Sequence, residues 1–233
     1  MQAQELDLGH LAHPDAGSHP GVVLIPDVWG LSDHYRDLAG RLAGEGFAVL
    51  AIDPYRKTGH PKLSDPSSAM AWIRELPDPV VIDTIQEAID ALVAHPSVSG
   101  RKVGIVGFCM GGQYALLAAC TCRGLSACAP CYGMVRYAAD LDPGKKPRSP
   151  LDALPGLTCP LLGLYGAEDA IIPPGDVEAL RAGLEASGRP FELHVYEGAG
   201  HAFMNETRPP MYRPEAARDA WGRLVPFLRE RLA

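Results

Sequence analysis

Cys109 stands in a sequence pattern that is typical of a catalytic nucleophile. The segment Gly107-Phe-Cys-Met-Gly-Gly112 places glycines two residues before and two residues after this cysteine. An apolar run (102–107) precedes the cysteine, and a run typical of a helix (113–122) follows it. A strand, a tight turn and a helix with the nucleophile at the turn form the Gly-x-Ser-x-Gly nucleophile elbow, here with sulfur in place of oxygen. We predict that Cys109 is the nucleophile, because the helix N-terminus behind it favours a thiolate.

An acid and a base follow Cys109 in the chain order of α/β-hydrolases, which is nucleophile, acid, base. Asp169 comes just after the apolar run 160–165, and His201 follows the strand-like run 191–196. The papain order of Cys, His and Asn does not fit. We expect His201 to take and return the proton and Asp169 to hold the imidazole in the required tautomer. Glu168 is the rival acid, and we favour Asp169 because Glu168 lies one residue closer to the strand.

An oxyanion hole needs two backbone N–H groups near the nucleophile. In this type of elbow one N–H belongs to the residue after the nucleophile, which is Met110 here. The other comes from the loop after an early strand. The apolar run Gly21–Ile25 is such a strand, and Val28 is the best candidate in the loop that follows it.

Apolar runs and helix-like segments alternate along the whole chain. This alternation predicts a mostly parallel sheet covered by helices on both faces, an α/β-hydrolase fold in one domain over residues 1–233. Residues 53–66 and 134–158 are expected to be long connections, and Pro226 is expected to kink or interrupt the last helix. The predicted strands are 5–13 at an edge, 21–25, 47–52, 102–107, 125–132, 160–165 and 191–196, and the predicted helices are 32–43, 66–76, 80–94, 113–122, 177–186 and 214–232.

The elbow allows two other interpretations, a dinucleotide-binding turn and a cysteine that is only buried. A Rossmann dinucleotide site requires glycine where Cys109 stands and an acidic residue after the next strand, where the chain has Ala127-Cys-Ala129. A Cys109 that is only buried remains an alternative.

The spacings Cys-x-Cys and Cys-x-x-Cys among the four cysteines from Cys120 to Cys131 allow a zinc site. We favour small buried thiols there, because no histidine-bearing loop accompanies them, and we expect no metal.

Composition and charge limit the classes of partner. The net charge is −7, from 21 Lys and Arg against 28 Asp and Glu, so nucleic acid and anionic membranes are not expected partners. The first seven residues are neither basic nor apolar, and the chain has no apolar run of about 18 residues. We therefore expect neither a signal peptide nor a transmembrane helix, and a cytoplasmic location.

The chain resembles the dienelactone hydrolase family over almost its whole length. The resemblance rests on Gly107–Gly112, Gly166-Ala-Glu-Asp169, Gly200-His-Ala-Phe203 and the early segment Ile25-Pro-Asp-Val-Trp-Gly30. It implies an enzyme that opens enol-lactones such as carboxymethylenebutenolide, with no cofactor, during the breakdown of aromatic compounds. The cysteine is the specific feature, because most α/β-hydrolases carry serine at this position.

Two positions depart from the pattern of this family. The family has a glutamate that meets the nucleophile, and Asp27 stands at that position, one methylene shorter. The family also has an arginine that binds the substrate carboxylate four residues after the catalytic histidine, where this chain has Asn205. Arg208 lies three residues later and can replace that arginine if the loop bends back. Trp29, Tyr132 and Phe203 are expected either to line the substrate pocket or to serve as packing residues.

These observations predict a cofactor-independent cysteine hydrolase that acts on a lactone or activated ester through a thioester. Its expected partner is a small-molecule substrate, and it is expected to be a monomer or a small homo-oligomer. A broad-specificity carboxylesterase and a non-catalytic, thiol-reactive protein of the same fold are the alternatives.

Overall fold

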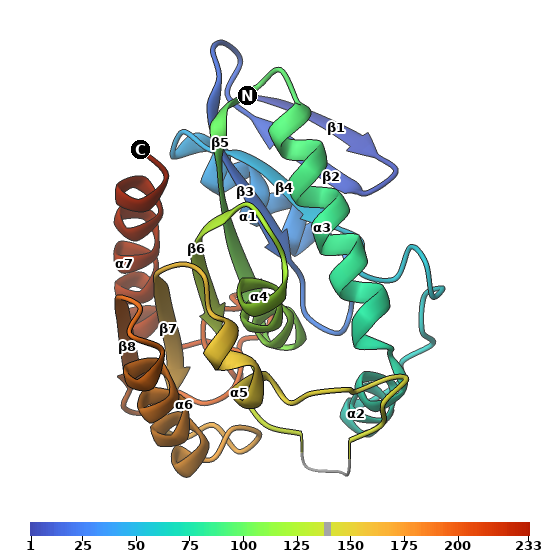
Figure 1. Cartoon of the computed structure of the whole chain (residues 1–233), viewed down its shortest axis with the longest axis vertical. Coiled ribbons are helices and arrows are strands. Elements are labelled where there is room, and N and C mark those ends of the chain that lie inside the picture. Colours follow the sequence, from blue (N-terminus) through green and yellow to red (C-terminus); the bar gives the residue numbers. More distant parts are fainter. Residues whose placement is uncertain (138–140) are drawn as a thin grey trace.

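A sheet of eight strands forms the centre of the part of the chain that the computed structural model describes, residues 1–137 and 141–233 (Figure 1). The strands are β1 (Gln2–Leu6), β2 (Gly9–His13), β3 (His19–Ile25), β4 (Ala48–Ile52), β5 (Val98–Phe108), β6 (Leu125–Cys131), β7 (Leu161–Gly166) and β8 (Phe191–Tyr196). Their order in the sheet is β1-β2-β4-β3-β5-β6-β7-β8. The β1–β2 and β2–β4 pairs are antiparallel and the other pairs are parallel. The predicted mostly parallel sheet is therefore confirmed.

Helices cover both faces of this sheet (Figure 1). On one face α1 (Asp33–Gly44) packs on β2 and β4, and α7 (Pro214–Leu232) packs on β5 and β6. On the other face α3 (Asp78–Ala94) and α4 (Met110–Thr121) pack on β5, beside α5 (Pro150–Ala153), the 3-10 turn η1 (Leu154–Gly156) and α6 (Pro174–Ser187). The remaining helix is α2 (Pro66–Glu75). No helix within the described residues is long and apolar enough to span a bilayer.

The central strands are buried on both sides because helices cover both faces. Every residue of β4 and β7 is buried, as are Gly21–Ile25 of β3 and Val103–Phe108 of β5. Continuous apolar runs are the sequence pattern of such strands. The parallel strands end at the same edge of the sheet, so the loops that follow β3, β5, β6, β7 and β8 all meet there.

The N-terminal segment differs from the single edge strand predicted over residues 5–13. It forms a hairpin, in which β1 and β2 are joined by a two-residue turn at Asp7 and Leu8. Gly9, the first residue after this turn, has a φ of 142°, and a Cβ there would overlap the carbonyl oxygen of Ala51 in the neighbouring strand β4. The alternating pattern of residues 5–13 continues through the turn, which is why the sequence pattern did not reveal it.

Two further expectations are revised. Pro226 does not interrupt the last helix, since α7 continues from Pro214 to Leu232. A proline removes one backbone donor, and packing of the helix on the sheet retains the remaining turns. The predicted connection 134–158 contains α5 and η1, and its residues 138–140 lie outside the described part of the chain.

A buried ion pair ties this connection to the helical face behind the elbow. Lys146 Nζ lies 2.5 Å from Asp78 Oδ1, and the two side chains are 8% and 5% exposed. Tyr114 donates a hydrogen bond to the same oxygen over 2.9 Å, and Tyr137 donates to Asp78 Oδ2 over 2.6 Å. Gln113, in the first turn of α4, donates in turn to Tyr137 Oη over 3.0 Å. The carboxylate is thus held by three donors, which offset the cost of burying its charge.

Candidate active site

Cys109 occupies the sharp turn between β5 and α4. Its φ of 56° and ψ of −117° are a backbone conformation that side-chain-bearing residues seldom adopt, and they direct the residue out of the strand before the helix begins. A Cβ on Gly107 would overlap the carbonyl oxygen of Gly111, and one on Gly111 would overlap the carbonyl oxygen of Ile25. The two glycines therefore permit the close approach of strand and helix that the turn requires.

The thiol, imidazole and carboxylate named from the sequence lie within hydrogen-bond distance of one another. His201 Nε2 is 3.0 Å from Cys109 Sγ, and His201 Nδ1 is 2.9 Å from Asp169 Oδ2. The other oxygen, Asp169 Oδ1, accepts the backbone N–H groups of Ile171 and Ile172 over 2.8 and 3.2 Å. The Asp169 side chain is fully buried, whereas Glu168 is exposed. This geometry favours Asp169 over Glu168 as the partner of the imidazole.

The surroundings of His201 favour its protonated form. Burial lowers the pKa of the imidazole, but a negative charge on Cys109 and the hydrogen bond and charge of Asp169 outweigh burial. The pKa of His201 is raised from 6.5 to about 10. The ring is therefore suited to stabilise a thiolate beside it and to carry a proton at neutral pH.

The loops that carry the acid and the base are joined by their backbones. Glu168 N–H donates to the carbonyl oxygen of Ala199 over 2.9 Å, and Ala167 N–H donates to that of Tyr196 over 2.9 Å. A Cβ on Gly166 would overlap the same Ala199 carbonyl oxygen. Ala202, next to His201, has a φ of 59°. These contacts fix the spacing between Asp169 and His201.

The two candidate oxyanion residues meet at one tyrosine. The Tyr55 hydroxyl donates to the Val28 carbonyl oxygen over 2.6 Å and lies 3.5 Å from Met110 Sδ. Within the described residues, neither Val28 N–H nor Met110 N–H donates to a protein acceptor. The first N–H groups of a helix have no partner in the helix itself, so Met110 N–H is available to a bound oxygen.

A pocket of about 100 Å³ opens beside Cys109 and His201. Its wall combines the loop after β3, the helix α2 and the loops after β7 and β8. Most of its lining is apolar, and Arg208 is the one cation that lines it apart from His201, judged over the described residues. The lining residues are Asp27, Val28, Trp29, Pro66, Ala69, Met70, Ile73, Cys109, Ile171, His201, Ala202, Arg208 and Met211.

Asp27 and Arg208 interact with one another in this pocket. The carboxylate is buried, accepts Trp29 N–H over 2.9 Å and lies 3.9 Å from an Arg208 nitrogen. Burial raises the pKa of Asp27, although the Trp29 N–H and Arg208 oppose the shift. No hydrogen bond joins Asp27 to Cys109 among the described residues, and the thiol is paired with His201 instead. The Arg208 guanidinium stacks on the Trp29 ring, 5.2 Å from its centre.

Three other residues named from the sequence lie behind the pocket surface. Tyr132 is buried, and its ring contacts those of His201 and Phe203 at centroid distances of 5.4 and 5.5 Å. Phe203 is fully buried between Tyr132 and Tyr196. Asn205 is buried and accepts the backbone N–H and the hydroxyl of Thr207 over 3.0 and 2.7 Å. These side chains support His201 and its loop rather than line the cavity.

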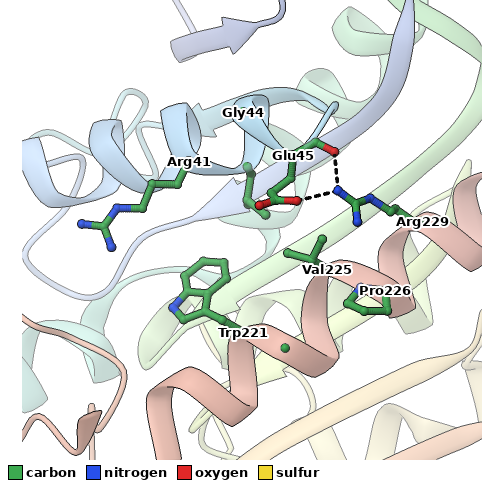
Figure 2. Close-up of a pocket in the computed structure, with 9 residues that line it drawn as sticks. Arg41, Gly44, Glu45, Trp221, Val225, Pro226 and Arg229 are labelled. Carbon is green, nitrogen blue, oxygen red and sulfur yellow. Dashed lines mark hydrogen bonds and ion pairs between the residues drawn. The ribbon is translucent and has the colours of Figure 1, made fainter. Parts of the chain in front are cut away.

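A larger hollow lies elsewhere, between α1 and α7, and none of the candidate site residues lines it (Figure 2). Its volume is about 680 Å³ and Trp221 forms one wall. The guanidinium of Arg229 bonds Glu45 at its edge, and Arg41 is paired with Glu206. Volume alone is therefore a poor guide to the chemistry of this chain, because the reactive groups line the smaller pocket.

The described residues contain no group of three or more His, Cys, Asp or Glu side chains arranged to hold a metal ion. The cysteines are all free thiols. Burial raises the pKa of Cys122 to about 11, and it raises the pKa of the buried Cys128 and Cys131 as well. This agrees with their interpretation as buried apolar residues.

Comparisons with known proteins identify the family of this chain. The model of the dienelactone hydrolase family matches residues 8–232. A Bradyrhizobium protein provisionally named 2-oxo-3-(5-oxofuran-2-ylidene)propanoate lactonase is 34% identical over 97% of this chain and 90% of its own length. The carboxymethylenebutenolidase of Rhodococcus opacus is 32% identical over 95% of this chain and 85% of its own length.

A solved structure gives the same result for the fold. The crystal structure of a Klebsiella pneumoniae protein, provisionally named a dienelactone hydrolase, superposes with a TM-score of 0.87. It is 32% identical and covers 95% of this chain and 92% of that chain. The predicted α/β-hydrolase fold is thereby confirmed.

The close approach at the elbow predicts the effect of a single methyl group. Gly107→Ala is expected to lower the free energy of unfolding by more than about 3 kcal/mol, or to prevent folding, because the Cβ meets backbone that cannot move aside. Gly40→Ala is the control: nothing lies within 4 Å of a Cβ there, and alanine in a helix is expected to add about 0.5–1 kcal/mol. Urea unfolding followed by circular dichroism measures both, and equal stability of the two variants would contradict this account.

Proposed function

Because this chain belongs to the dienelactone hydrolase family, we propose that it opens a lactone or enol ester by attack of the Cys109 thiolate. The observation that carries the proposal is the position of the His201 ring. One ring nitrogen lies 3.0 Å from the cysteine sulfur and the other lies 2.9 Å from a buried carboxylate. A nucleophile, a base and a group that orients the base are the parts that covalent acyl transfer needs.

In the proposed first step, the sulfur of Cys109 attacks the lactone carbonyl carbon. Negative charge then develops on the carbonyl oxygen, where the N–H groups of Val28 and Met110 stabilise it. The ring C–O bond breaks, His201 gives its proton to the departing enol oxygen, and a thioester remains on Cys109. Because the leaving group stays covalently attached to the acyl chain, the thioester carries the whole substrate.

In the proposed second step, water replaces the sulfur. His201 takes a proton from the water, the resulting hydroxide attacks the thioester carbon, and the carbon–sulfur bond breaks. The products are the free acid and the regenerated Cys109 thiolate beside the imidazolium. Asp169 holds Nδ1 of the ring throughout, which keeps Nε2 directed at the reacting atoms.

The sulfur nucleophile limits which substrates are turned over efficiently. A thiolate is a better leaving group than an alkoxide, so the tetrahedral intermediate of a simple alkyl ester returns to starting material. An enol oxygen leaves more readily, because its charge is delocalised. This difference supports enol-lactones and activated esters over alkyl esters, and distinguishes the proposal from a broad-specificity carboxylesterase.

The position of Arg208 supports the proposal that the substrate carries a carboxylate. Arg208 enters the same pocket as Cys109 because the chain turns back after Asn205, where Arg208 N–H donates to the Asn205 carbonyl oxygen over 3.1 Å. The guanidinium of Arg208 stacks on the Trp29 ring, which orients its plane. Arg208 lies 3.9 Å from Asp27, so its N–H groups are left to bind a ligand. A planar guanidinium is well matched to a carboxylate.

The role of the thiol is tested by substitution. Cys109→Ala is expected to lower kcat/KM for an enol-lactone by at least about 10³-fold, since the covalent step is lost. Cys120→Ala, which removes another partly buried thiol, is the control and is expected to stay within about twofold of wild type. Loss of ultraviolet absorbance of the lactone measures both rates. Equal activity of wild type and Cys109→Ala would exclude cysteine catalysis. Mass spectrometry of acid-quenched wild type tests the thioester directly and should show Cys109 heavier by the mass of one whole lactone.

The raised pKa of His201 predicts the pH profile. The imidazolium that protonates the leaving oxygen persists until the pH exceeds its pKa of about 10. The alkaline fall of kcat/KM is therefore expected near pH 10, and not near 6.5, the ordinary pKa of an imidazole. Asp169→Asn removes a charge that raises this pKa, so the alkaline limb should move to lower pH. An alkaline limb that does not move in Asp169→Asn would argue against the role of this carboxylate.

The role of Arg208 is tested with a matched pair of substrates. For a carboxylated enol-lactone, Arg208→Gln is expected to lower kcat/KM by about 10-fold to 100-fold, the value of hydrogen bonds to a charged group. For the methyl ester of the same lactone, which lacks the charge, the loss is expected to be less than about threefold. Steady-state kinetics of both substrates measures the effect. Equal losses on the acid and its methyl ester would remove Arg208 from carboxylate recognition.

A further inference from the structure

Half of the exposed large hydrophobic side chains surround the pocket of Cys109. Among the described residues, six such side chains are exposed, and Trp29, Ile171 and Met211 line this pocket with exposures of 39%, 42% and 40%. The other three, Met1, Leu141 and Val195, do not line it. We call Trp29, Ile171 and Met211 the apolar rim. Exposed apolar side chains gathered at one place on a surface mark a binding site.

The apolar rim is held in place by backbone contacts of three separate loops. Trp29 N–H donates to Asp27 over 2.9 Å, Ile171 N–H donates to Asp169 over 2.8 Å, and Met211 N–H donates to the Arg208 carbonyl oxygen over 2.9 Å. Each rim residue is thus fixed through a residue that lines the pocket or holds its histidine. The rim therefore belongs to the rigid structure of the site, and its exposure does not reflect a loose surface loop.

Apolar lining continues from the rim into the pocket. Ala69, Met70 and Ile73 of α2 line the same wall, and Ala69 and Ile73 are buried. The pocket, of about 100 Å³, is bordered by the rim, so a substituent on the substrate ring can extend from the pocket onto Trp29, Ile171 and Met211. Apart from His201, the charged groups of the lining are Asp27 and Arg208, which pair with each other beside Trp29.

We propose that the substrates of this enzyme carry an apolar alkyl or aryl substituent that rests on Trp29, Ile171 and Met211. The proposal rests on the function proposed above, and it names the part of the substrate that lies outside the reacting ring. Water is displaced from both surfaces when the substituent binds. Each methylene that leaves water completely contributes about fourfold in affinity, and a methylene half covered contributes about twofold.

The test is a series of neutral enol-lactones, 5-alkylidenefuran-2-ones, whose alkylidene chain lengthens from one carbon to six. For wild type, kcat/KM is expected to rise about two- to fourfold with each added methylene until the chain passes the rim. The Ile171→Ser/Met211→Ser double variant should lose most of this increase, measured relative to its own rate on the shortest lactone. Val195→Ser, which removes an equally exposed apolar side chain from β8, should keep the wild-type increase. Thermal melting verifies that all three proteins are folded.

Binding measurements separate this proposal from the proposed function. Calorimetric titration of the same lactones into Cys109→Ala reports contacts with the rim without turnover. The rim proposal is supported if the affinity of Cys109→Ala rises with chain length and no longer rises after Ile171→Ser and Met211→Ser are added. This result supports the rim proposal even if wild type hydrolyses none of the lactones. Affinity and kcat/KM that do not change with chain length overturn the rim proposal, even if the shortest lactone is hydrolysed rapidly. Light scattering tests for an interface between two copies of the chain. A dimer of wild type that becomes a monomer in the rim variant would assign the rim to this interface and would also overturn the substrate proposal.

Discussion

The site depends on the contact between the end of β5 and the first turn of α4, where two glycines bring backbone against backbone. Gly107 lies against the carbonyl oxygen of Gly111, and Gly111 lies against that of Ile25. A third contact extends this packing, since a Cβ on Gly112 would lie 2.7 Å from the carbonyl oxygen of Cys131. The three parallel strands β3, β5 and β6 therefore determine the position of Cys109, and its unusual φ of 56° follows from that packing. Strain of this kind is retained where the surrounding structure enforces it.

Charge in the site is arranged around one imidazole ring. A buried carboxylate, itself held by two backbone N–H groups, faces one ring nitrogen, and the thiol faces the other. Asp27 and Arg208 form a second, weaker pair that lines the same pocket. The two pairs are distinct: in the proposed function the first takes part in the bond-breaking steps and the second contacts the substrate. This separation fits a family in which related chains act on different lactones.

Cys109, Asp169 and His201 could be chosen as candidates from the sequence, because each lies in the turn or loop that follows a strand. Gly-x-Cys-x-Gly requires a strand before it and a helix after it, and Asp169 and His201 lie in the loops after two later strands. Arg208 was less predictable, since its entry into the pocket depends on a turn at Asn205 that the sequence does not specify. Tyr132 and Phe203 show another limit. An aromatic residue after a strand has the same sequence pattern whether it lines a cavity or packs beneath a catalytic histidine, and only the structure shows that both are buried.

The buried Asp78–Lys146 pair has a consequence for how this chain can diverge over evolutionary time. Loss of either side chain leaves the other charge buried without its partner, a state that costs about 3–5 kcal/mol in proteins. Intermediates with one substitution would therefore be removed by selection before the second could arise. The two positions are 68 residues apart, one at the start of α3 and the other before α5. They are expected to be inherited as a unit, so that lineages which replace this pair with apolar residues change both positions together.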